Sequence, residues 1–124
     1  MASQGFSDKG QEKVVDILTT DNTWRHVGWG SGGETAFAVT QTGLVSANPE
    51  ARTAGTISQP AANTHRVVGT IEATAARDVD EVAVFDASTS GNMIMRGTFT
   101  ALALITADRA RFTCDIVFAD SSEV

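Results

Sequence analysis

VDEVAVF at residues 79–85 is the first of three runs that decide the fold class of this 124-residue chain. The other two are MIMRGTF at 93–99 and RFTCDIVF at 111–118. In the last run the residues alternate, with Phe112, Cys114, Ile116 and Phe118 on one face and Arg111, Thr113 and Asp115 on the other. A period of two is typical of a strand that has one buried face. Turn-forming residues, DASTSGN at 86–92, separate the first two runs. The pattern predicts a mainly β protein, an antiparallel β-sandwich of the jelly-roll-like kind.

One short α-helix is expected near the N-terminus, over Lys9–Thr20. Its apolar stripe consists of Val14, Val15, Ile17 and Leu18. Asp8 is the expected N-cap with Gln11 as its capping-box partner, and Asp21-Asn22 is a natural stop. We therefore expect a flexible polar arm over residues 1–8 and a single β-sandwich domain over residues 9–124.

Further strands are predicted at Trp24–Gly30, at Ala51–Gln59 as an edge strand, at Thr64–Thr74 and at Leu102–Leu104. Glu34–Asn48 has weak periodicity and is expected to be a long connection. The predicted core consists of Val67, Ile71, either Val82 or Phe85, Met93, Met95, Phe99, Phe112, Ile116 and Phe118. At least one of Trp24 and Trp29 should also pack in the core, and the other could anchor a subunit contact.

Composition limits the possible partners. The formal net charge is −6, and the seven arginines are scattered singly along the chain, so direct nucleic-acid binding is disfavoured. The sequence has no signal-peptide pattern and no apolar run of membrane-spanning length, so no membrane partner is expected. The single cysteine, Cys114, lies on the apolar face of a strand and is expected to be a buried small hydrophobe.

The segment Gly28–Gly33 matches the dinucleotide-binding pattern G-x-G-x-x-G. That motif requires a helix N-terminus after the glycines to hold the pyrophosphate. Glu34–Phe37 shows no amphipathic helix, and no strand-helix-strand pattern is present. A glycine-rich turn that leaves a strand is the better interpretation, and no cofactor is expected.

Catalytic and metal-binding signals are weak. His26, His65 and Cys114 could supply metal ligands, but none lies at a metal-motif spacing from another. Four acids, Asp78, Asp80, Glu81 and Asp86, cluster near the ends of one strand, where carboxylates are usually solvated or cap backbone amides. No nucleophile elbow accompanies either histidine. We expect no catalytic, cofactor-binding or metal site, and therefore no enzyme.

The order of several short segments carries a resemblance. Trp29–Gly32, Ala51–Thr56 and Val68–Ala73 are followed by Val79–Ala87, Gly91–Phe99 and the terminal alternating strand. This order resembles small virion proteins of tailed bacteriophages, in particular head-decoration or capsid-cement proteins. A related strand pattern is found in tail-fibre and baseplate domains.

The resemblance implies a viral structural protein that binds the outside of an assembled capsid and stabilises contacts between major capsid proteins. It implies two partners, the major capsid protein and further copies of this chain as a homotrimer or homodimer. The protein would be made in the host cytoplasm and located on the virion surface. The alternatives are a tail, fibre or baseplate accessory protein, or a small receptor- or carbohydrate-binding module. The segments expected to bind are Met1–Asp8, Ser31–Asn48 and Ser58–Asn63.

Overall fold

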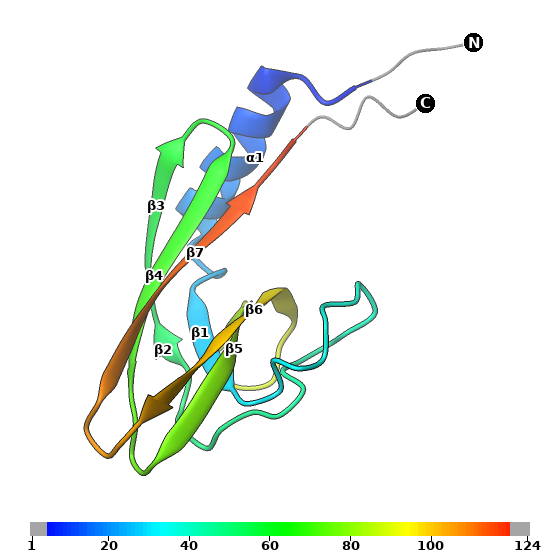
Figure 1. Cartoon of the computed structure of the whole chain (residues 1–124). Coiled ribbons are helices and arrows are strands. Elements are labelled where there is room, and N and C mark those ends of the chain that lie inside the picture. The colour runs from blue at the N-terminus through cyan, green and yellow to red at the C-terminus, as the bar shows by residue number, and fades with distance from the viewer. Residues whose placement is uncertain (1–4, 120–124) are drawn as a thin grey trace.

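The computed structural model describes residues 5–119 and shows two antiparallel sheets with one helix beside them (Figure 1). The elements are α1 (Asp8–Asp21), β1 (His26–Gly30), β2 (Thr53–Ala54), β3 (Thr56–Ala61), β4 (Thr64–Glu72), β5 (Arg77–Phe85), β6 (Met93–Leu104) and β7 (Arg109–Val117). Sheet A has the strand order β2-β1-β5-β6, and sheet B has the order β3-β4-β7. The expected fold class, a mainly β antiparallel sandwich with a short N-terminal helix, is confirmed.

The last four strands form one long two-stranded ribbon that is bent over on itself. β5 pairs with β6 in sheet A, while the strands on either side of that hairpin, β4 and β7, pair with each other in sheet B. The bend is held where the Ala73 amide donates to the Asp108 carbonyl and the Ala107 amide donates to the Ala73 carbonyl, both at 2.8 Å. In Figure 1 the two turns of the bend lie next to each other at the bottom of the sandwich. Such nested pairing is the jelly-roll-like feature of the fold.

The core lies between the two sheets. Its buried members are Val27, Trp29, Val67, Ile71, Ala73, Val79, Val82, Val84, Ala110 and Cys114. Phe112 is half-buried against this cluster and contacts the Trp29 ring edge-on at 6.2 Å and the Phe99 ring at 5.7 Å. The prediction that one tryptophan packs in the core is therefore confirmed for Trp29.

The predicted core is confirmed in part. Val67, Ile71 and Val82 are buried in it, and Met95, Phe99 and Phe112 pack against it. Phe85 is also buried, but it lies on the opposite face of β5, because residues 82 and 85 differ by an odd number.

The core prediction was wrong for three residues, because Met93, Ile116 and Phe118 are half-buried and lie outside the central cluster. Ile116 pairs with His65 at the end of sheet B that approaches α1, as Figure 1 shows. Ile116 therefore lies at that end of sheet B and outside the core cluster between the two sheets.

The helix is confirmed, but two details were wrong. Ser7, not Asp8, is the N-cap, and its hydroxyl accepts a hydrogen bond from the Gly10 amide at 3.1 Å. Asp8 is the first helical residue, and residues 1–4 of the expected arm lie outside the described part. The Gln11 side chain donates to the Phe6 carbonyl at 2.8 Å and does not complete a capping box.

The predicted apolar stripe of α1 contains one error. Val15 is fully buried, and Val14 and Leu18 are half-buried, whereas Ile17 is 65% exposed. At 100° per residue, position 17 is rotated about 200° from position 15 and faces solvent. The helix ends as expected, with Asn22 in the left-handed region at φ 60° and its amide bonded to the Leu18 carbonyl.

Two strand predictions also change. The predicted edge strand Ala51–Gln59 is divided into β2 and β3, which belong to different sheets because the chain crosses between them at Gly55. A side chain at Gly55 would come within 2.7 Å of a Val67 methyl carbon, so only glycine fits this crossing. The separate segments predicted at 93–99 and 102–104 form the single strand β6, with a bulge where its pairing with β5 shifts.

Candidate functional site

A third layer of chain covers the outer face of sheet A. It is the connection between β1 and β2, residues 31–52, which we call the β1–β2 loop. Five consecutive residues of β5, Glu81–Phe85, are buried, although alternate residues of a strand point to opposite faces. The core covers one face of β5 and the β1–β2 loop covers the other. The returning arm of the loop is tied to the end of β1, since the Ser31 amide donates to the Ser46 carbonyl at 2.9 Å.

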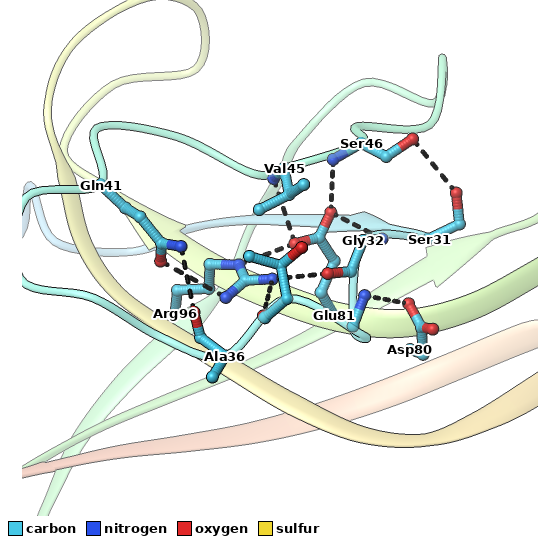
Figure 2. Close-up of polar contacts among 11 residues, drawn as sticks. Ser31, Gly32, Ala36, Gln41, Val45, Ser46, Asp80, Glu81 and Arg96 are labelled. Carbon is cyan, nitrogen blue, oxygen red and sulfur yellow. Dashed lines mark hydrogen bonds and ion pairs between the residues drawn. The ribbon is translucent and has the colours of Figure 1, made fainter.

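The carboxylate of Glu81 is the anchor of this loop. Its side chain is fully buried and accepts three backbone hydrogen bonds, from Gly32 at 3.1 Å, Ser46 at 2.9 Å and Val45 at 3.2 Å (Figure 2). The neighbouring carboxylate of Asp80 accepts a bond from the Gly33 amide at 2.7 Å. Both arms of the β1–β2 loop are therefore attached to β5.

Arg96 of β6 completes the anchor. Its fully buried guanidinium pairs with Glu81 at 2.7 Å, and its Nη2 donates to the carbonyls of Gly32 at 2.9 Å and Thr35 at 3.0 Å. Burial alone would raise the pKa of Glu81, but the hydrogen bonds from Ser46, Arg96, Val45 and Gly32 outweigh it and lower the pKa. The carboxylate is therefore charged at neutral pH, and the ion pair holds the base of the β1–β2 loop against sheet A.

Above this anchor the loop presents an apolar tip, which we define as Phe37 and Val39. The side chain of Phe37 is 52% exposed and that of Val39 is 89% exposed. The Gln41 side chain donates to the Ala36 carbonyl at 3.2 Å, and the Gln41 backbone N–H donates to the Ala38 carbonyl at 3.0 Å. These bonds give the tip a defined backbone path. Figure 1 shows this segment projecting away from both sheets. An exposed apolar tip on an anchored base is suited to contact another macromolecule.

A cavity of about 260 Å³ lies where the loop returns to β2, with Gly28 and Leu44 among its lining residues. The Arg52 guanidinium stacks on the Phe85 ring, 3.4 Å from its centroid, and donates to the carbonyls of Ala87 and Ser90. These contacts fix the second end of the loop against the β5–β6 turn.

Glu50, which also lines this cavity, is a second buried anchor. It accepts hydrogen bonds from the Trp29 indole at 3.1 Å, from the Thr74 amide at 3.0 Å and from Arg77 Nε at 2.9 Å. Burial would raise its pKa, but these bonds outweigh burial and lower the pKa to about 2. All these donors come from the protein itself, so Glu50 holds the loop end to the core.

The glycine motif has the expected role. β1 ends at Gly30, no helix follows Gly33 within residues 5–119, and the segment is a turn. A side chain at Gly30 would come within 2.4 Å of the Ser46 carbonyl oxygen, so glycine is needed for the close approach of the loop.

The three candidate metal ligands are not brought together. Among the described residues no group of three or more His, Cys, Asp or Glu side chains could hold a metal ion. His65 is buried, with its Nε2 3.0 Å from the Trp24 carbonyl oxygen. Cys114 is buried in the core as expected, and burial raises the pKa of its thiol to about 11.

The four clustered acids have different environments. Asp78 is exposed. The other three, Asp80, Glu81 and Asp86, accept hydrogen bonds from backbone amides, which was one of the two predicted roles. Asp86 accepts its bond from the Asn92 amide at 2.7 Å. The solvated alternative was wrong for Glu81. One signal of its role was visible in the sequence, since Glu81 directly precedes the apolar run at 82–85, where a buried carboxylate would require a partner.

One of the segments expected to be a binding loop is mainly part of a strand. Ser58–Asn63 is mostly strand, because β3 extends to Ala61 and β4 begins at Thr64. Ser31–Asn48 is confirmed as a long connection, and it is the segment that carries the apolar tip.

No family model, curated protein or solved structure matches this chain. Within residues 5–119 there is no helix with the length and apolar character required to cross a membrane.

Proposed function

We propose that this chain is a viral structural protein of the head-decoration, or cement, class. In this proposal it binds the outside of an assembled capsid and adds contact area between neighbouring major capsid proteins. The observation that carries the proposal is the apolar tip, Phe37 and Val39, held on a loop whose base is anchored by a buried ion pair. The order of segments that resembles decoration proteins supports the same assignment.

The anchored base makes the tip an effective contact. A flexible loop loses conformational entropy when it binds, whereas a loop already fixed by Glu81 and Arg96 loses less. Full burial against a shell would contribute about 1.5–3 kcal/mol for Val39 and about half of that for Phe37, whose side chain is already half-buried. Because a shell offers many equivalent positions, individually modest contacts can stabilise it collectively.

The net charge is compatible with this location. A charge of −6 favours the outer surface of a shell over contact with packaged nucleic acid. The binding energy would then come from apolar contacts such as the tip.

Cosedimentation tests the proposal. Purified protein is mixed with undecorated shells of the major capsid protein and, separately, with tails. We expect binding to shells and a higher rupture temperature for decorated shells. Binding to tails alone would reject the capsid assignment in favour of the tail alternative, and an unchanged rupture temperature would reject the cement role.

Variants test the part played by the tip. Phe37→Ser combined with Val39→Ser should lower shell occupancy at least tenfold while leaving the unfolding midpoint unchanged, since both side chains are exposed. Ile17→Ser is the matched control, because Ile17 is an exposed apolar residue on α1. Equal occupancy of the wild type and the double variant would show that another surface binds the shell.

A further inference from the structure

The outer edge of β6 is unpaired, and the C-terminal part of this strand has no charged residue. β6 is the last strand of sheet A, and the stretch Gly97–Ile105, GTFTALALI, contains no charged residue and no proline. Leu102 is 42% exposed and Ile105 is 68% exposed, and the four residues at 100–103 are all exposed. An exposed apolar edge strand is a template for pairing with another strand.

Each of the other three sheet edges carries a feature that blocks such pairing. β2 has only two residues. β3 contains Pro60, has a register shift and lies beside α1. β7 carries exposed charges, and two of them form cross-strand ion pairs, Arg66 with Asp115 and Arg109 with Glu72. β6 also bulges, but among the edges of the described sheets it is the long one whose exposed stretch, 97–105, has neither a proline nor a charged residue.

The shape of β6 divides this edge into two parts. Between its pairings with Val79 and Glu81, β6 contains two more residues than β5, so the strand bulges near Thr100 and Ala101. Regular pairing with β5 resumes at Leu102 and continues to Leu104. A hollow of about 310 Å³ lies beside this end, lined by Ala76, Arg77, Asp78, Ala103, Leu104 and Ile105. A partner strand would thus find unpaired backbone groups along the edge, with this hollow beside the end of the strand.

We propose that the β6 edge binds a second copy of this chain, with two β6 strands pairing antiparallel around a two-fold axis. The pairing would join two four-stranded sheets into one sheet of eight strands and would close after two copies. Leu102 and Ile105 of both copies would then be removed from water.

Charge favours a second copy as the occupant. Two molecules of net charge −6 repel each other over most of their surface. Any antiparallel register within residues 97–105 places only uncharged side chains opposite one another, so this edge is where two copies can approach without like-charge contacts. The proposal does not depend on binding to a shell.

The mass of the protein in solution, measured without shells over a range of concentrations, tests the proposal. We expect the mass to rise from one chain to two, and the dimer to strengthen with salt because screening reduces the repulsion. Amide hydrogen exchange within residues 98–105 should slow as the dimer forms, while exchange in β7 should not change. A single chain at every concentration and salt level, or a trimer, would overturn the proposal.

Ala103→Lys is the test variant, since Ala103 is exposed and pairs with the exposed Asp78. Thr113→Lys on β7 is the control with the same change in net charge. We expect Ala103→Lys to weaken dimerisation at least tenfold and Thr113→Lys to leave it unchanged; equal effects would overturn the proposal. Thr100→Lys serves as a second test if Ala103→Lys lowers the unfolding midpoint. A wild type that stays a single chain, but loses shell occupancy through Ala103→Lys, would overturn the second copy as occupant and assign the edge to a shell strand.

Discussion

Replacing Arg96 with Met should lower the free energy of unfolding by about 3–5 kcal/mol, the usual cost of removing one partner from a buried ion pair. The change removes the 2.7 Å contact with Glu81 and the bonds to the carbonyls of Gly32 and Thr35. Glu81 would keep its three backbone donors, so the lower half of this range is expected. The loss is still large beside a typical total stability of about 5–15 kcal/mol.

Urea unfolding at neutral pH measures this loss, with equal m-values confirming that the wild type and the variant unfold alike. A double-mutant cycle isolates the pair: Glu81→Gln together with Arg96→Met should cost less than the sum of the two single changes, by about 1–3 kcal/mol. In the double variant no buried charge is left without its partner, which is the physical reason for this difference.

Acidification provides a second measurement of the same pair. The folded pKa of Glu81 is lowered from 4.5, so its stabilising contribution is present above about pH 4.5 and is lost as the pH falls. Without Arg96 this pKa rises, so the difference between wild type and Arg96→Met should shrink in acid. A loss below about 1 kcal/mol, or strict additivity in the cycle, would refute the assignment of the pair as the loop anchor.

Three further changes probe the core, the loop and the second anchor. Phe112→Ala should cost about 3–5 kcal/mol, towards the lower end because the ring is half-buried; a loss below about 1 kcal/mol in denaturant melts would show that the ring contributes little to the core. Gly30→Ala should destabilise by about 1–3 kcal/mol, since its new carbon would lie 2.4 Å from a carbonyl oxygen, whereas Gly43→Ala, with nothing within 4 Å, should change stability by less than about 1 kcal/mol; similar urea midpoints for the two variants would contradict the close packing of the loop. Glu50 has a folded pKa of about 2 against an ordinary 4.5, so its contribution, up to about 3 kcal/mol, should be present above pH 4.5 and lost as the pH falls towards 2. Glu50→Gln should flatten the stability–pH curve over that interval, and an unchanged curve would exclude Glu50 as the titrating group.

The sequence by itself determined the class of the fold and the faces of its most regular strands. In β7 and β4 the alternation of apolar and polar residues predicted correctly that Cys114, Val67 and Ile71 face the core. The helix and its stop at Asn22 were also predictable. These features depend on neighbours one to four positions apart, so their pattern is visible along the chain.

The tertiary structure alone decided the site. Glu81 is bonded to amides 35 to 49 residues away and to Arg96, 15 residues away, and no local pattern specifies such partners. The burial of β5 on both faces follows from the β1–β2 loop lying over sheet A, and the crossing at Gly55 follows from the approach of Val67. Periodicity reports which side of a strand is apolar, but which distant segment covers the other side depends on the packing of the whole chain.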